Sequence, residues 1–98
     1  MRHEVKIWPN YFDDVADRKK THELRRNDRS YSVGDTMVMR EWIPETGTYT
    51  GREILAEITH IIERGLAASD RSKITMGLSP GYAILSIDVM AVTANDKR

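Results

Sequence analysis

The chain has 98 residues and a formal net charge of zero at pH 7; 40% of its residues are hydrophobic and 31% are charged. This size suits one soluble domain with one core over residues 1–98, and the zero charge argues against a strong non-specific polyanion binder, though not against a single basic face. There is no Cys to form a thiolate metal site and no run of the ~20 apolar residues that a membrane span needs, so we expect a cytoplasmic protein without membrane contact.

The N-terminal segment predicts a strand followed by a short helix. Residues 4–8 alternate polar and apolar side chains, with Val5 and Ile7 on one face, as in a half-buried strand. Pro9 suits the first turn of a helix, and residues 10–18 carry apolar side chains at positions 11, 12, 15 and 16. We expect this stripe to pack the helix onto a sheet.

Four further segments have the alternation or the β-branched content of strands. They are residues 21–26, 36–42, 52–63 and 82–92. The apolar spacing of residues 52–63 also fits a helix, but the β-branched content favours a strand. The connections are predicted as a turn at 27–30, a tight turn at 33–35, a hairpin loop at 43–51, a long loop at 64–81 and a frayed tail at 93–98.

The resulting order is β-α-β-β-β-β. Many strands and one helix in fewer than a hundred residues favour an α+β, mainly β fold, built as a small barrel of about five strands with the helix over one opening.

Metal and nucleophile motifs are missing from the sequence. His3, His22 and His60 lie far apart and have none of the spacings of a zinc site. No glycine-rich phosphate loop and no Gly-x-Ser-x-Gly elbow occurs. We therefore expect neither a metal nor a cofactor.

The basic run at residues 18–29 is the strongest candidate site. Six of its twelve residues are Lys or Arg and two are acidic, so its local charge is +4. In the predicted strand, Glu23 and Arg25 share one face, and Lys20 stands at the strand entrance. Such a set suits a planar polar ligand, for example a nucleobase, or the phosphate beside it. The alternative is a charged edge strand that only prevents edge-to-edge pairing.

Trp42 ends a predicted strand and has two interpretations. It packs the core as an ordinary strand-end aromatic, or it offers a stacking surface for a base.

The motif at residues 18–25 resembles that of the ASCH domains, a family in the PUA-like superfamily of small β-barrels. The family pattern is Gly-x-Lys-x-x-Glu-x-Arg, which Lys20, Glu23 and Arg25 match. Arg18 stands where the family has Gly, the residue that most easily makes a left-handed exit from a helix. Similarity to an uncharacterised bacterial and phage subgroup continues through residues 3–12, 19–29, 33–35, 40–52 and 81–87.

The resemblance implies an RNA-binding module with a cleft between barrel and helix. The partner would be RNA or a nucleoside-type ligand. The expected binding residues are Lys20, Thr21, Glu23, Arg25, Arg26, Arg29 and Trp42.

Two other functions stay open. Some ASCH proteins resemble amidohydrolases that act on N4-acetylcytidine, for which Lys20 and Glu23 are the catalytic candidates; Lys20 matches the family Lys, while the family Thr falls on Glu23. The other is binding of a protein partner through the loop at residues 64–81.

Overall fold

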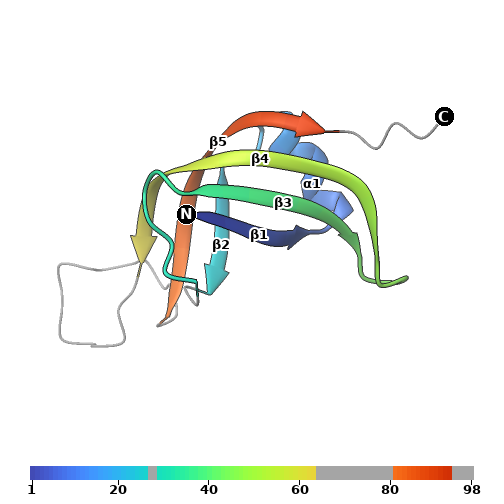
Figure 1. Cartoon of the computed structure of the whole chain (residues 1–98), viewed down its shortest axis with the longest axis horizontal. Coiled ribbons are helices and arrows are strands. Elements are labelled where there is room, and N and C mark those ends of the chain that lie inside the picture. Colours follow the sequence, from blue (N-terminus) through green and yellow to red (C-terminus); the bar gives the residue numbers. More distant parts are fainter. Residues whose placement is uncertain (27–28, 64–80, 94–98) are drawn as a thin grey trace.

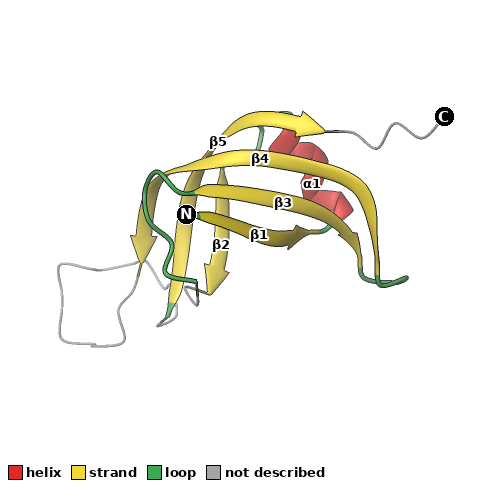
Figure 2. Cartoon of the chain, viewed as in Figure 1, coloured by secondary structure: helices red, strands yellow, loops and turns green. Residues whose placement is uncertain are grey.

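The computed structural model describes residues 1–26, 29–63 and 81–93. It contains five strands and one helix, in the β-α-β-β-β-β order that the sequence predicts (Figures 1 and 2). The elements are β1 (Arg2–Ile7), α1 (Pro9–Ala16), β2 (His22–Arg26), β3 (Thr36–Ile43), β4 (Thr48–Glu63) and β5 (Tyr82–Thr93).

The strands form one sheet in the order β1-β3-β4-β5-β2. β1 runs parallel to β3, and the other neighbours are antiparallel. The long strands β4 and β5 bend strongly, with register shifts along their pairing, so the sheet curls into a half-barrel (Figure 1). Helix α1 contacts β3 and β5. The predicted α+β, mainly β fold is confirmed in this form.

The half-barrel has two edges, β1 and β2. In the described part of the chain, no backbone pairing joins these two strands. Because these two edge strands do not pair, the half-barrel is open between them. The candidate site lies on this open side.

The core follows the alternation of the strands. One apolar face of each of β1, β4 and β5 is buried, and helix α1 adds two buried side chains. These residues are Val5, Ile7, Phe12, Val15, Ile54, Ala56, Ile58, Ala83, Leu85, Ile87 and Val89. Strand β3 is covered on both faces, because Met37, Val38 and Met39 are all buried.

Helix α1 is shorter than the predicted range 10–18. It begins at Pro9 and ends at Ala16, because the chain turns out of the helix through Arg18, whose φ is +61°. Within the predicted stripe, Phe12 is buried, whereas Tyr11 is 47% exposed. The apolar spacing was therefore wrong for Tyr11, which the helix leaves at the rim of the open side.

Three other predicted boundaries also differ. β1 begins at Arg2 and ends before Trp8, since Pro9 already starts the helix. The hairpin loop is only residues 44–47, because Thr48 pairs with Ile43 and extends β4. Thr93 pairs with Glu53 and belongs to β5, not to a frayed tail.

The predicted long loop at 64–81 lies outside the described residues except for Gly81, and so does the tail from residue 94 onward. The proposal of a protein partner on that loop therefore has no structural counterpart here. Within the described ranges, no helix is long and apolar enough to cross a membrane.

Candidate functional site

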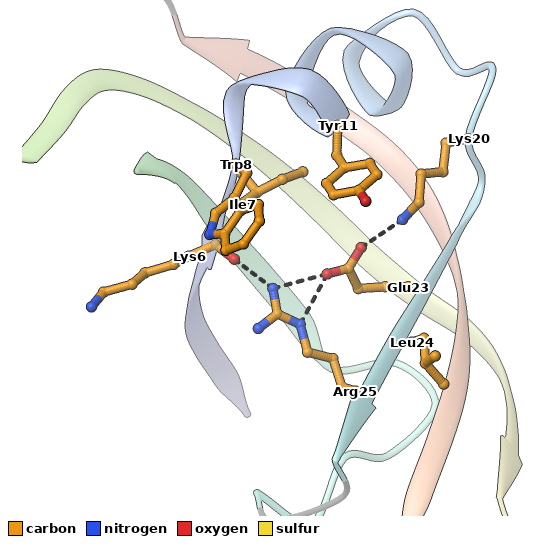
Figure 3. Close-up of a pocket in the computed structure, with 8 residues that line it drawn as sticks. All are labelled: Lys6, Ile7, Trp8, Tyr11, Lys20, Glu23, Leu24 and Arg25. Carbon is orange, nitrogen blue, oxygen red and sulfur yellow. Dashed lines mark hydrogen bonds and ion pairs between the residues drawn. The ribbon is translucent and has the colours of Figure 1, made fainter. Parts of the chain in front are cut away.

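An open cleft of about 400 Å³ lies at the open side of the half-barrel (Figure 3). One wall comes from the end of β1 and the first turn of α1. The other wall comes from β2 and from Lys20, which precedes it. The lining residues are Lys6, Ile7, Trp8, Tyr11, Lys20, Glu23, Leu24 and Arg25.

The floor of the cleft is the carboxylate of Glu23, which is only 7% exposed. Its Oε1 accepts a hydrogen bond from Lys20 Nζ at 2.9 Å. Its Oε2 lies 2.9 Å from Arg25 Nε and 2.8 Å from Arg25 Nη2. A carboxylate held by two cations in this way has a fixed orientation.

Both cations are themselves anchored to the main chain. Lys20 Nζ donates to the carbonyl oxygen of His22 at 2.8 Å. Arg25 Nη2 donates to the carbonyl oxygen of Lys6 at 2.5 Å, and so connects β2 to β1. The alternation of β2 explains the placement, because Glu23 and Arg25 are two residues apart and point to the same side.

Two aromatic side chains stand at the rim of the cleft (Figure 3). Trp8 has extended backbone at the N-cap of α1, and Tyr11 follows in the first helical turn. They are 51% and 47% exposed, although each is large and apolar. Lys20 Nζ lies 5.6 Å from the centre of the Tyr11 ring. The cleft thus combines exposed ring faces with a charged floor.

The structure brings together Lys20, Glu23 and Arg25, the three residues of the sequence motif. Arg29 lies nearby along the same open side, where its Nη1 donates to the carbonyl oxygen of Glu4 at 2.8 Å. Thr21 is exposed and does not line the cleft; its carbonyl oxygen accepts from Ile87 and extends the pairing of β2 with β5.

Arg26 and Trp42 also lie outside the cleft lining. The Arg26 guanidinium is 5.7 Å from the centre of the Tyr82 ring. Trp42 is half-buried and packs edge-on against Tyr49, with 4.8 Å between ring centres. Lys6 Nζ lies 4.0 Å from the Trp42 ring, so Lys6 is the link between Trp42 and the cleft.

Sequence reasoning missed the wall formed by Lys6, Ile7, Trp8 and Tyr11. Those residues read as ordinary strand and helix positions, and their proximity to β2 is a tertiary contact. One signal was available: Trp8 and Tyr11 are three positions apart across Pro9, a spacing that places two side chains on the same side of a helical turn.

A second charged cluster ties the helix side of the sheet together. Glu41 is 2% exposed and accepts from Arg52 Nε and Nη2, both at 2.7 Å, and from Thr50 Oγ1 at 2.6 Å. The Arg52 guanidinium holds the pKa of Glu41 below its usual range, against the opposing effect of burial. Arg52 Nη1 reaches Asp13 of α1 at 3.2 Å. These charges satisfy one another, so the cluster is a structural tie.

A metal site is not formed by the described residues, among which no group of three His, Asp or Glu side chains could hold an ion.

Comparison with known proteins adds two findings. A family model described as "Domain of unknown function (DUF3850)" matches residues 2–87. The chain is also similar to the "Uncharacterized 12.9 kDa protein in GpA 3'region" of Escherichia phage P2, with 44% identity over 61 residues. That match covers 62% of this chain and 54% of the phage protein, so it spans about half the length of the relative.

Proposed function

The chain belongs to the DUF3850 family, and we propose from the geometry of its own cleft that it binds single-stranded RNA by holding one exposed base. The observation that carries the proposal is the buried carboxylate of Glu23, fixed between Lys20 and Arg25 below two exposed aromatic rings. The likeness of this motif to that of the ASCH domains agrees with the same function.

The aromatic rim supplies a surface for stacking. Trp8 and Tyr11 are large aromatic side chains, yet both are about half exposed, and both line the same cleft. Stacking of a base on an aromatic side chain contributes about 1–3 kcal/mol and tolerates any base, because every base has a π face. The rim therefore favours a ligand with a flat ring.

The charged floor favours a base edge over a phosphate. Two cations surround one carboxylate, so the floor offers both donors and an acceptor within a few ångströms. A phosphate group placed there would meet the negative charge of Glu23, whereas the edge of a base presents donors and acceptors together. The Lys6 ammonium lies over the Trp42 ring beside the cleft, where it would contact a phosphate of a strand that runs past that side.

The size of the cleft agrees with a single base. Its volume of about 400 Å³ lies near the lower end of ligand pockets, which span roughly 300–1,000 Å³. The cleft is open to solvent along one side, which would let the sugar–phosphate chain of an RNA run past it while one base enters.

Fluorescence anisotropy with labelled single-stranded RNA tests the proposal. We expect Trp8→Ala and Tyr11→Ala each to weaken binding by about fivefold or more, the effect of losing one stacking contact. Tyr49→Ala is the matched control, because Tyr49 is a 40% exposed aromatic outside the cleft lining. A Lys20→Ala/Arg25→Ala double variant should lose both affinity and part of the salt dependence of binding.

Equal, salt-insensitive binding by the wild type, the rim variants and the double variant would overturn the proposal. Folding of each variant is checked by circular dichroism, so that lost binding is not confused with unfolding.

The hydrolase function is a second candidate, based on one contact. Lys20 Nζ and Glu23 Oε1 are 2.9 Å apart, a distance at which a proton can pass between them. Lys20 Nζ also donates to the carbonyl oxygen of His22, which suits a positioning cation better than a nucleophile. Incubation with N4-acetylcytidine decides the question: release of cytidine supports hydrolysis, and no release at high protein concentration removes it for that substrate.

A further inference from the structure

We infer that the bound strand places a second base in a hollow beside the cleft, at the point where α1 begins. The inference rests on the proposed function, since it extends the same RNA from the base in the cleft to the next base along the strand. The hollow has a volume of about 320 Å³ and lies between the start of α1 and the hairpin that joins β3 to β4. Its lining residues are Trp8, Pro9, Asn10, Pro44 and Glu45.

Trp8 lines both the cleft and this hollow, so the two are neighbours. The Trp8 side chain is 51% exposed, but its main chain is fixed, because its carbonyl oxygen accepts from the amides of Tyr11 and Phe12, both at 3.0 Å. Pro9 adds a fixed φ directly after it. A strand that leaves the cleft past Trp8 therefore meets the second hollow next.

The other wall of the hollow belongs to a closed turn. The amides of Thr46 and Gly47 both donate to the carbonyl oxygen of Ile43, at 3.3 and 2.8 Å. Thr46 Oγ1 lies 2.7 Å from Thr48 Oγ1 in the same turn. Pro44 has a fixed φ where the turn starts. Both segments that line the hollow are thus restrained in the free protein, which lowers the entropy cost of binding a ligand between them.

The lining favours a base over a phosphate. Trp8, Pro9 and Pro44 offer ring surfaces on which a flat ligand can lie. The side-chain amide of Asn10 has both donors and an acceptor for a base edge. Glu45 carries the charge, and the described lining holds no Lys or Arg. A phosphate placed there would meet a carboxylate with no cation to offset it.

Lys6 is the cation placed to meet the phosphate that joins the two bases. It lines the cleft, and its side chain points away from Glu23 (Figure 3). Its Nζ lies 4.0 Å from the centre of the Trp42 ring, and Trp42 is two residues before Pro44 of the second hollow. The other two cations of the cleft lining are paired with Glu23. The cation without that pairing thus lies on the hairpin side, towards which the strand would continue.

Short ligands that differ only in the number of bases test the inference. The first is an adenine dinucleotide. The others are the same dinucleotide with one base removed, from either the 5′ or the 3′ sugar, so that all of them keep the joining phosphate. NMR titration of isotope-labelled protein measures each affinity. We expect the two-base ligand to bind about fivefold tighter or more than either one-base ligand, the effect of one further stacked base.

An Asn10→Ala/Pro44→Ala double variant tests the hollow itself. It removes the amide and one ring surface and leaves every residue of the cleft lining in place. This variant should lose most of the gain from the second base and keep the wild-type affinity for the one-base ligands. Thr46→Ala is the control, because Thr46 is an exposed residue of the same hairpin outside the lining. It should keep the full gain.

Chemical shifts locate the second base. The backbone amide signals of Asn10 and Glu45 should move further with the two-base ligand than with either one-base ligand. If the double variant does not fold, this comparison and the two affinities decide with the wild type alone.

The outcomes separate this inference from the proposed function. Equal affinity for the one-base and two-base ligands overturns the second hollow and leaves RNA binding intact. A double variant that keeps the full gain, or that weakens all ligands alike, also overturns it. Failure of these ligands and of longer single-stranded RNA to bind overturns both the inference and the proposed function.

Discussion

Arg25 Nη2 donates a hydrogen bond to the main-chain carbonyl oxygen of Lys6 across the open side of the half-barrel, at 2.5 Å. β1 and β2 are the two edges of the sheet, and Arg25 joins them with a side chain instead of a backbone ladder. Arg29 makes the same kind of contact with the carbonyl oxygen of Glu4, two residues back along β1. The arginines of the basic run thus cover the exposed carbonyls of an edge strand and shape the cleft at once.

Replacement of Arg25 should cost stability as well as binding. We expect Arg25→Ala to lower the free energy of unfolding by about 2 kcal/mol, because buried Glu23 loses one of its two cationic partners and the Lys6 carbonyl loses its donor. Arg25→Lys should recover only part of this, since one ammonium cannot reproduce the planar fork. Urea denaturation measures the difference.

Arg26→Ala is the control for this prediction. Arg26 is the next residue of β2 and faces away from the cleft, where its guanidinium lies 5.7 Å from the Tyr82 ring, a contact of about 0.5–1 kcal/mol at an exposed site. Equal destabilisation by Arg25→Ala and Arg26→Ala would show that the contact across the open side contributes nothing.

The fold could be predicted largely because its signals are local. The alternation of Ala83, Leu85, Ile87 and Val89 identifies an inward strand face without any knowledge of neighbours, and the structure buries all four. The same property limits the prediction at residue 11, where helical spacing places Tyr11 beside Phe12 but cannot say how far the sheet extends beneath the helix.

The candidate site could be predicted only where its residues are close in sequence. Lys20, Glu23 and Arg25 lie within six positions; strand alternation places Glu23 and Arg25 on one side, and Lys20 reaches Glu23 from just before β2. Trp8 follows β1, the opposite edge of the curled sheet, and lines the same cleft as these three residues. No spacing in the sequence reveals that proximity. Trp42 was expected in the site because it is aromatic, yet β3 carries it to the Tyr49 side.

Loss of the ion pair between Glu41 and Arg52 should lower the free energy of unfolding strongly. Removal of Arg52 would leave a 2% exposed carboxylate without its bidentate partner, a change that costs about 3 kcal/mol or more. The same change removes two contacts between β4 and α1, since Arg52 also pairs with Asp13 and lies 4.2 Å from the centre of the Phe12 ring. Thermal and urea unfolding of Arg52→Ala check the prediction.

Arg40→Ala provides the comparison for Arg52→Ala. Arg40 pairs with Glu53 at 3.1 Å, but both side chains are more than a third exposed, so the pair contributes less than about 1 kcal/mol. Similar losses for the two variants would mean that the burial of Glu41 does not matter.

We expect ionised Asp35 to stabilise the fold, and this contribution to be lost in acid. The hydrogen bond with His3, followed by that with the amino group of Met1, lowers the pKa of Asp35 from its ordinary value of 3.8 to about 2. A carboxyl whose pKa is lower in the folded state stabilises the fold above pH 3.8, where it is ionised in both states. That contribution should disappear as the pH falls from 3.8 towards 2.

The melting temperature of the wild type and of Asp35→Asn, followed across this range, isolates the contribution. The two curves should converge as the pH falls, because the variant lacks the ionisable group and Glu41 is common to both proteins. Parallel curves would contradict the assignment to Asp35.

The left-handed backbone of Arg18 should destabilise the fold, and substitutions at this position can measure that cost. Its φ is +61°, in the left-handed region that costs an L-residue other than Gly about 1–2 kcal/mol, and its Nη2 donates to the carbonyl oxygen of Val89 at 3.0 Å. Arg18→Ala loses the bond and keeps the strain, whereas Arg18→Gly loses the bond and relieves the strain. We therefore expect the Gly variant to be more stable than the Ala variant by about 1 kcal/mol in urea unfolding.

The same pair of substitutions at Lys19 shows whether the left-handed backbone is the cause. Lys19 is the next residue, and its φ is not positive. There Ala should be more stable than Gly, because Gly adds only freedom to the unfolded chain and relieves nothing in the folded one. The order of the two variants should thus reverse between neighbouring positions. If Ala is the more stable substitution at both, the exit of the helix through Arg18 is not strained, and the departure from Gly costs this chain nothing.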